Sequence, residues 1–279
     1  MRKLLNTLFI LSEETYLSLD GENIVILAEN SEKRRFPLHM LENIMCFSYK
    51  GASPALMGAC AERKIGLSFF SPNGKFLAGV HGKEYGNVLL RKQQYRVSDD
   101  REEQGVQYAK NMMIGKVYNS RWTLERTARD HKERVDYESI RKISAELQEG
   151  LLKIRTVDNI DQLRGIEGEL ASRYFSVFDE LILNQKDDFI FQTRNRRPPM
   201  DRVNALLSFA YAVVERECAN ALRSVGLDPF VGFMHTDRPG RESMALDIME
   251  EFRSILCDRF VLTLINTKTV RKDSFMKGD

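Results

Sequence analysis

The feature that most limits what this chain can fold into is a change in hydrophobic periodicity near residue 97. Before this point, short runs rich in β-branched and aromatic residues alternate with turn residues, a pattern typical of β-strands. After it, apolar residues recur at helical spacing over long stretches with few glycines, as in amphipathic helices. We therefore predict an α+β protein, in which a β-strand-rich domain over residues 1–97 precedes an all-α domain over residues 98–279.

Two tight hairpins and one helix are predicted in the first domain. The hairpin turns are expected at Asp20-Gly21 and at Pro72-Asn73-Gly74, because each of these sequences lies between two short apolar runs. The helix is expected over residues 53–63. Its start is indicated by Ser53, a favourable N-cap, followed by Pro54, which is favourable at the first helical position.

The second domain is predicted to consist of helices near residues 101–130, 135–152, 158–184, 201–225 and 243–258. The prolines Pro198 and Pro199 before Asp201 indicate the start of the fourth helix, and Gly226 indicates its end.

Composition excludes several classes of protein. No apolar run is long enough to cross a bilayer, and the basic, apolar N-terminal stretch lacks a small-residue cleavage site, so we expect a first strand there. The cysteines show no CxxC spacing, which disfavours a zinc ribbon or a disulfide framework and indicates a cytoplasmic protein. The formal net charge is only +2, so binding to DNA would require local basic patches.

A carboxylate on an apolar helix face is the first candidate for chemistry. At about 100° per residue, Glu167 lies roughly 40° from Leu163, inside the apolar face of its predicted helix, whereas Glu169 points away. A buried carboxylate must be paired or bound to a metal. The pattern therefore leaves two alternatives open, an ion pair with an arginine and a metal ligand. Gly165 and Gly168 suggest the close approach of another backbone or of a ligand.

Two more candidates lie closer to the C-terminus. His235 ends an apolar segment, and although a lone histidine is more often structural, imidazole is a common metal ligand. Asp247 and Glu250 are three residues apart and therefore neighbours on one helix flank, but Glu251 is also near Asp247, and periodicity does not choose between the two glutamates. A solvated acidic face with Arg253 is the alternative.

One histidine with two or three carboxylates would form a mixed nitrogen and oxygen site. Such a site suits Mn2+ or Mg2+ better than a structural zinc ion. It can polarise a phosphate, activate a hydroxyl nucleophile and stabilise the leaving oxygen. The sequence contains no Walker-type glycine-rich loop, so nucleotide-driven work is disfavoured.

A basic segment is the fourth candidate. Arg194, Arg196, Arg197 and Arg202 are crowded into a short loop before a predicted helix, and residues 91–96 add further cations and a tyrosine. Guanidinium groups suit phosphates, so these arginines are candidate DNA-binding residues that contact phosphates rather than base edges. The alternative is a solubilising surface with intramolecular salt bridges.

Several segments in their order resemble the signature blocks of one family, the CRISPR-associated integrases of the Cas-one family. The resemblance covers essentially the whole chain and is closest to the variant that accompanies subtype I-C systems. It rests on residues 64–70, 90–95, 163–168, 197–211, 232–235 and 246–253.

The resemblance implies a site and an activity. It implies that Glu167, His235 and Glu250 bind a divalent metal, Mn2+ or Mg2+, that Asp247 is an acidic residue beside it, and that Glu250 rather than Glu251 is the ligand. It also implies metal-dependent cleavage and strand transfer on double-stranded DNA. The 3′ hydroxyl of a foreign fragment, the protospacer, would be joined to the CRISPR repeat in antiviral defence.

The resemblance also implies partners and further sequence. The expected partners are DNA, a small Cas-two-type protein and a second copy of the chain, which dimerises through the first domain. Ile44, Phe47, Phe69 and Phe70 favour the same dimer, because a domain of this size does not easily bury so many apolar residues alone. Related proteins continue with helical sequence beyond the position of Asp279.

Two other functions fit the same residues. A structure-specific nuclease of DNA repair would keep the metal site but change the biology. A non-catalytic DNA-binding scaffold would use only the basic loops. Metal-dependent turnover separates an enzyme from a scaffold, and joining of a duplex into a repeat separates an integrase from a nuclease.

Overall fold

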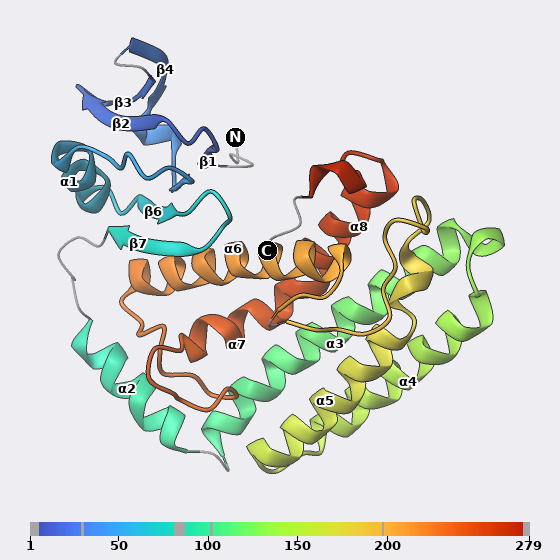
Figure 1. Ribbon diagram of the computed structural model, residues 1–279. Helices are drawn as coiled ribbons and strands as arrows, with labels where there is room; N and C mark the ends of the chain where they lie inside the picture. Colours follow the sequence, from blue (N-terminus) through green and yellow to red (C-terminus); the bar gives the residue numbers. More distant parts are fainter. Residues whose placement is uncertain (1–5, 29–30, 81–86, 101–102, 197, 276–279) are drawn as a thin grey trace. The chain divides into compact units, whose positions relative to one another are not determined.

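The computed structural model divides into two compact units, Met1–Asn87 and Val88–Asp279 (Figure 1). It describes residues 6–28, 31–80, 87–100, 103–196 and 198–275. The first unit is strand-rich and the second is helical, so the predicted α+β fold is confirmed.

The first unit contains two sheets. One has the strand order β1-β5-β6-β7, in which β7 is antiparallel to β6 and the other neighbours are parallel. The other is an antiparallel sheet with the order β2-β3-β4. The strands are β1 (Thr7–Ile10), β2 (Thr15–Asp20), β3 (Asn23–Ala28), β4 (Ser31–Pro37), β5 (Asn43–Cys46), β6 (Gly66–Phe70) and β7 (Phe76–Val80).

The local predictions for this unit are confirmed. Asp20 and Asn23 pair across the first hairpin, whose Gly21 has a φ of 56°, a value that favours glycine. The second hairpin joins β6 to β7. The helix α1 (Pro54–Glu62) begins where Ser53 accepts a hydrogen bond from the backbone N–H of Leu56.

The apolar residues that favoured a dimer differ in their surroundings. Ile44, Phe47, Phe69 and Phe70 are all buried, and Phe47 stacks on Phe70 with ring centroids 4.9 Å apart. Ile44 and Phe69 belong to the core that residues of both sheets and of α1 form, so the unit buries these two without a partner. Phe47 and Phe70 lie outside that core cluster, on the opposite face of the sheet.

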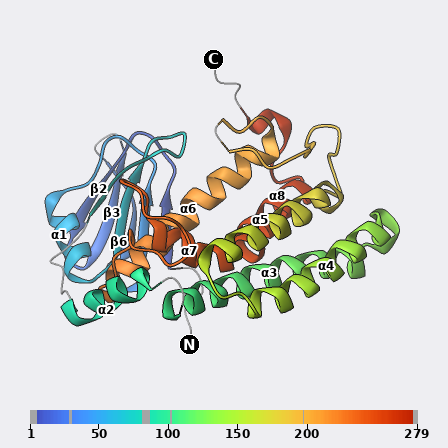
Figure 2. The same cartoon turned by 90° about the horizontal axis from the view of Figure 1, so that it is seen from below.

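The second unit is built around the long helix α3. In Figures 1 and 2, α3 lies beside α4 and α5, and α7 packs against its other side. The helices are α2 (Val88–Asp99), α3 (Gln104–Asp130), α4 (Tyr137–Arg155), α5 (Ile160–Ser176), α6 (Arg202–Val225), α7 (Ser243–Phe252) and α8 (Arg259–Asn266), with short 3-10 turns at Leu38–Met40 in the first unit and at Lys132–Arg134, Phe178–Leu181 and Lys272–Ser274 in the second.

The fourth predicted helix begins and ends as expected. Asp201 caps α6 by accepting a hydrogen bond from the N–H of Asn204, and Gly226 ends it with a φ of 85°. The third predicted helix, expected over residues 158–184, corresponds to α5, which ends at Ser176 before a 3-10 turn. Phe178 and Leu181 in that turn are buried, so the apolar spacing continues past the true end of the helix.

The helix α2 was not predicted as a helix. Its buried Gln94 donates to the backbone oxygens of Asp228 and Val231, and Arg91 donates to that of Gly226. These contacts join α2 to the second unit. The compact units therefore divide between residues 87 and 88, ten residues before the boundary predicted at residue 97.

The helix that begins at Ser243 changes its hydrogen-bonding pattern without ending. Residues Arg253–Asp258 are π-helical, and α8 follows directly. In the π-helical segment Ser254, Cys257 and Asp258 face the interior. π-Helical turns are rare and are frequent at functional sites.

The structure describes the cysteines and the helices on which two compositional predictions rest. All four cysteines are described, and they are buried and free. Among the helices of the described ranges, none is long and apolar enough to cross a membrane.

Candidate active site

Four segments of the second unit meet at one place. The helix α5 carries Glu167, the loop between α6 and α7 carries His235, and α7 carries both Asp247 and Glu250. The helix α3 packs against α5 and α7 and contributes Lys116, which contacts both Glu167 and Glu250. The structure therefore brings the predicted site residues together, although they are separated by up to 83 positions in sequence.

Asp247 holds the loop that carries His235. Its Oδ2 accepts hydrogen bonds from the backbone N–H groups of Phe233, at 2.6 Å, and Met234, at 2.9 Å. Its Oδ1 accepts from the His235 N–H at 2.9 Å and lies 2.6 Å from His235 Nδ1. Because Asp247 is fully buried, it fixes the loop and the imidazole in one arrangement.

This arrangement aims the other imidazole nitrogen at Glu250. A carboxylate at Nδ1 favours the tautomer with its hydrogen there, which leaves the lone pair of Nε2 free to bind a cation. His235 Nε2 lies 3.9 Å from Glu250 Oε1. Two donors about 2.1 Å from a shared ion can be separated by such a distance.

Gly232 allows the loop to approach α7. A Cβ atom at this position would lie 2.8 Å from Asp247 Oδ2 and 2.9 Å from the carbonyl carbon of Ser243. Any larger residue would displace the loop from the carboxylate that holds it. Gly165 and Gly168 differ, because a Cβ atom at either would meet nothing within 4 Å, so no neighbouring protein atom requires glycine there.

Glu250 is a buried carboxylate between two cations. Its Oε2 lies 2.7 Å from Lys116 Nζ, and its Oε1 lies 3.1 Å from Arg253. Burial by itself raises the pKa of Glu250, but the charges of Arg253 and Lys116 outweigh burial and lower this pKa to about 2. Glu250 is therefore an anion across the physiological pH range, as a metal ligand must be.

Glu167 is less buried and shares the ammonium group of Lys116 with Glu250. The alternative of an ion pair for Glu167 thus holds with a lysine in place of the arginine that the pattern suggested. Sequence reasoning missed Lys116 itself. Its position in the helix could have identified it. Lys116 is three residues after Met113 and four before Ser120, both buried, so it lies on the buried face of the helix.

The donor set fits a hard divalent cation. No three His, Cys, Asp or Glu side chains in the described ranges are arranged to hold a metal as they stand. Yet Glu167 and Glu250 contact the same ammonium group, so both reach one point, and His235 Nε2 faces Glu250. One imidazole and two carboxylates are the ligands that manganese and magnesium sites use.

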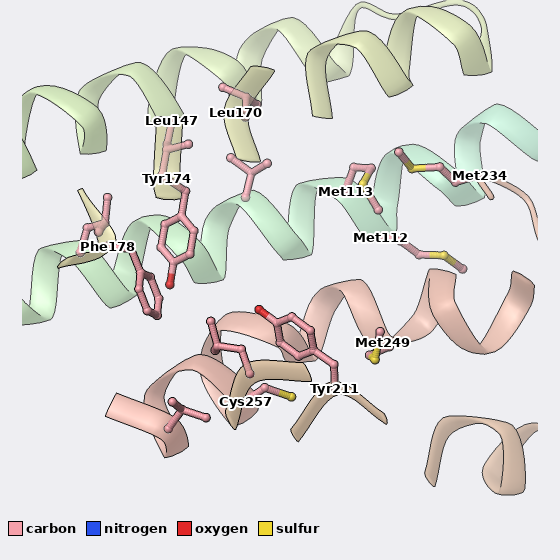
Figure 3. Packing of buried hydrophobic residues seen from close by; sticks show 14 of the residues in the cluster. Met112, Met113, Leu147, Leu170, Tyr174, Phe178, Tyr211, Met234, Met249 and Cys257 are labelled. Atoms are coloured by element: carbon pink, nitrogen blue, oxygen red, sulfur yellow. The ribbon is translucent and has the colours of Figure 1, made fainter. Parts of the chain in front are cut away.

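A second buried network supports Arg253. Asp258 accepts hydrogen bonds from the hydroxyls of Tyr174, at 3.0 Å, and Tyr211, at 2.6 Å, which point towards one another in Figure 3. The Arg253 guanidinium lies over the Tyr211 ring, 4.9 Å from its centroid. Burial raises the pKa of Asp258 to about 6, although the two hydroxyls and Arg253 oppose it. Sequence reasoning did not find this network.

The predicted basic segment has several environments. Arg194 turns inward, where it donates to Asn204 and Ser208 and lies over the Tyr211 ring. Arg202 donates to the backbone oxygen of Asp188. Arg196 is exposed and lines a hollow together with Lys116, Glu167 and Arg253, whereas Arg197 lies outside the described residues.

Comparison with known proteins shows the family to which this chain belongs. Residues 8–279 match the family model described as CRISPR associated protein Cas1. The chain belongs to the Cas1 family. A Cas1 relative from Chlorobaculum tepidum, named CRISPR-associated endonuclease Cas1 1, is 45% identical over 99% of this chain and 80% of that protein. CRISPR-associated endonuclease Cas1 2 of Rhodospirillum rubrum is 43% identical over 100% of this chain and 81% of that protein.

Solved structures share the Cas1 fold. A casposase bound to integration product has a TM-score of 0.80 and 24% identity, covering 99% of this chain and 77% of that chain. A Cas1 protein from Thermotoga maritima has a TM-score of 0.79 and 23% identity, covering 98% of this chain and 82% of that chain. The α+β architecture is therefore the Cas1 architecture.

Proposed function

We propose that this Cas1 chain is a divalent-metal-dependent DNA endonuclease and integrase that inserts spacers into a CRISPR array in antiviral defence. The observation that carries the proposal is the convergence of Glu167, His235 and Glu250 around one point, with Asp247 orienting the histidine. The relatives are named CRISPR-associated endonucleases, which supports the proposal. So does the likeness to a casposase bound to integration product.

The site residues would have different roles in strand transfer. Glu167, His235 and Glu250 would hold Mn2+ or Mg2+, which supplies a Lewis acid for the phosphodiester and the hydroxyl nucleophile. Asp247 keeps Nδ1 of His235 occupied, so that Nε2 stays directed at the site. A 3′ hydroxyl oxygen forms a bond to phosphorus while the bond to the leaving 3′ oxygen breaks, and the proton moves from the attacking to the leaving oxygen.

A joining assay tests this function. The chain is mixed with a short duplex and a supercoiled plasmid that contains a CRISPR repeat, with Mn2+, with Mg2+ or with a chelator. The expected result is duplex joined to the repeat only when metal is present. Cutting without joining would favour the repair nuclease, and DNA binding without turnover would favour the scaffold.

Partners and setting follow from the same proposal. We infer that the chain acts in the cytoplasm on double-stranded protospacer and repeat DNA, together with a small Cas2-type protein, in a system of subtype I-C. Solved Cas1–Cas2 complexes share its fold. The assay run with and without a Cas2-type protein tests the partner, because joining that is equally efficient without it would remove that protein from the reaction.

A homodimer through the first unit is also proposed. Phe9, Leu11 and Tyr49 are large apolar residues that this unit leaves exposed, Leu11 to 71%, and such residues favour an interface. We expect light scattering to give the dimer mass at micromolar concentration, and Leu11→Asp to shift it toward the monomer. A monomer in the unchanged protein would contradict the proposal.

The arginines give a prediction about DNA binding. Because Arg196 is exposed and Arg194 is bonded internally, Arg196→Gln should flatten the log-log dependence of DNA affinity on salt by about one unit, as expected for one lost phosphate contact. Arg194→Gln is the matched control and should lower stability with little change in slope. Binding is measured over a salt series with repeat and unrelated duplexes. An unchanged slope for Arg196→Gln would make this arginine a surface residue only.

A further inference from the structure

Lys116 occupies the point at which the two candidate carboxylate ligands meet. Its ammonium nitrogen lies 2.7 Å from Glu250 Oε2 and contacts Glu167 Oε1, and its side chain is only 11% exposed. The backbone at this position belongs to the middle of α3, which packs against both α5 and α7. The contact is therefore built into the helix packing.

The charges explain why a cation belongs there. Glu167 and Glu250 both contact Lys116, so their carboxylates lie close enough to repel each other when no cation is between them. Arg253 pairs with Glu250 from another direction, and its charge also interacts with that of Glu167. Lys116 differs in that its ammonium nitrogen contacts both carboxylates directly.

A divalent cation would compete with this ammonium group. Carboxylate oxygens bind Mg2+ at about 2.1 Å, so an ion held by the oxygen of Glu250 that contacts Lys116 would lie within about 5 Å of the ammonium nitrogen. At that distance like charges repel strongly in a partly buried site. We expect this repulsion to drive the lysine away from the carboxylates when the ion binds.

The surrounding hollow is lined by more basic than acidic side chains. Lys116, Arg196 and Arg253 line it together with Glu167 and Asp258, and an excess of cations suits a DNA phosphate. We propose that Lys116 is an internal counter-ion that exchanges the two carboxylates for a DNA phosphate, so that metal and DNA bind cooperatively. This inference rests on the metal site of the proposed function.

Cooperativity of this kind is reciprocal. If DNA draws Lys116 away from the carboxylates, it tightens metal binding, and metal must tighten DNA binding by the same factor. A lysine that only stabilises the fold would produce no such coupling.

Metal binding in the absence of turnover tests the proposal. Free Mn2+ is measured by electron paramagnetic resonance during titration of the unchanged protein, Lys116→Met and Lys116→Gln. Each titration is repeated with a duplex that ends in dideoxynucleotides and cannot be joined. Lys110→Met is the matched control, because Lys110 lies on the same helix and donates to the backbone oxygens of Arg155 and Val157, away from the candidate ligands.

The neutral variants should bind Mn2+ about tenfold more tightly than the unchanged protein when DNA is absent, because they lack the positive charge that repels the ion at about 5 Å. DNA should tighten Mn2+ binding several-fold in the unchanged protein and in Lys110→Met, but much less in both Lys116 variants. Without metal, the Lys116 variants should also unfold at a lower temperature, and Mn2+ should restore this loss.

Two outcomes would overturn the inference in different ways. If the Lys116 variants bind Mn2+ with the affinity of the unchanged protein while Glu167→Ala binds it weakly, the metal site stands and the counter-ion role fails. If neither the unchanged protein nor the Lys116 variants bind Mn2+, the metal site of the proposed function fails as well.

Discussion

Replacing His235 with alanine is expected to lower the rate of metal-dependent DNA joining by about three orders of magnitude. His235 is the only nitrogen donor among the candidate ligands, and its Nε2 faces Glu250. The fold should survive, because Asp247 still accepts hydrogen bonds from the backbone N–H groups of residues 233–235. Joining is measured with a labelled duplex under single-turnover conditions.

The control for this variant is His131→Ala, which removes an imidazole near the C-terminal end of α3. Without metal, DNA affinity should change little in either variant, because the proposed phosphate contacts belong to arginines and to Lys116. If the joining rate of the His235 variant is within threefold of the rate of the unchanged protein, His235 has no role in the mechanism.

Replacing Asp247 with alanine is expected to affect both stability and activity. Three backbone N–H groups and one imidazole nitrogen contact its carboxylate, and buried donors left without partners are costly. We expect a loss of about 3–5 kcal/mol in the free energy of unfolding. Joining should also fall by at least about tenfold, because the imidazole would lose its orientation.

Urea unfolding measures the stability of the second unit, and the joining assay measures activity, so the two effects are separated. Asp247→Asn is the matched control, because it keeps one oxygen acceptor and the volume, so its loss of stability should be smaller than that of Asp247→Ala. Equal stability of Asp247→Ala and the unchanged protein would show that the loop is held by other contacts.

The elements with strong local signals could be predicted from the sequence. The α6 helix has a capping aspartate at one end and Gly226 at the other, and its apolar spacing fills the interval. The α2 helix does not have such a pair of terminal signals. Gln94 and Arg91 attach it to a distant loop by hydrogen bonds from their side chains to backbone oxygens. Such contacts leave no periodic trace in the sequence.

The candidate site could be predicted only in part for a similar reason. Apolar spacing identified Glu167 as a carboxylate on a buried face, but it did not identify the lysine on another helix that contacts it. Asp247 stood out only as a neighbour of Glu250 on a helix flank. Its hydrogen bonds to three consecutive amides depend on how the loop folds over α7, which no pattern of residue types specifies.

The π-helical turn after α7 makes this part of the chain intolerant of insertions. A π-helical turn already holds more residues than an α-helical turn, so one further residue in Arg253–Asp258 would rotate everything after it by about 100° relative to α7. Val261, Leu262 and Ile265 of α8, now buried, would then turn out of the core, and Asp258 would leave its two tyrosines. Side chains such as Leu256, which is 50% exposed, are free to vary in identity, while the number of residues in the turn is not.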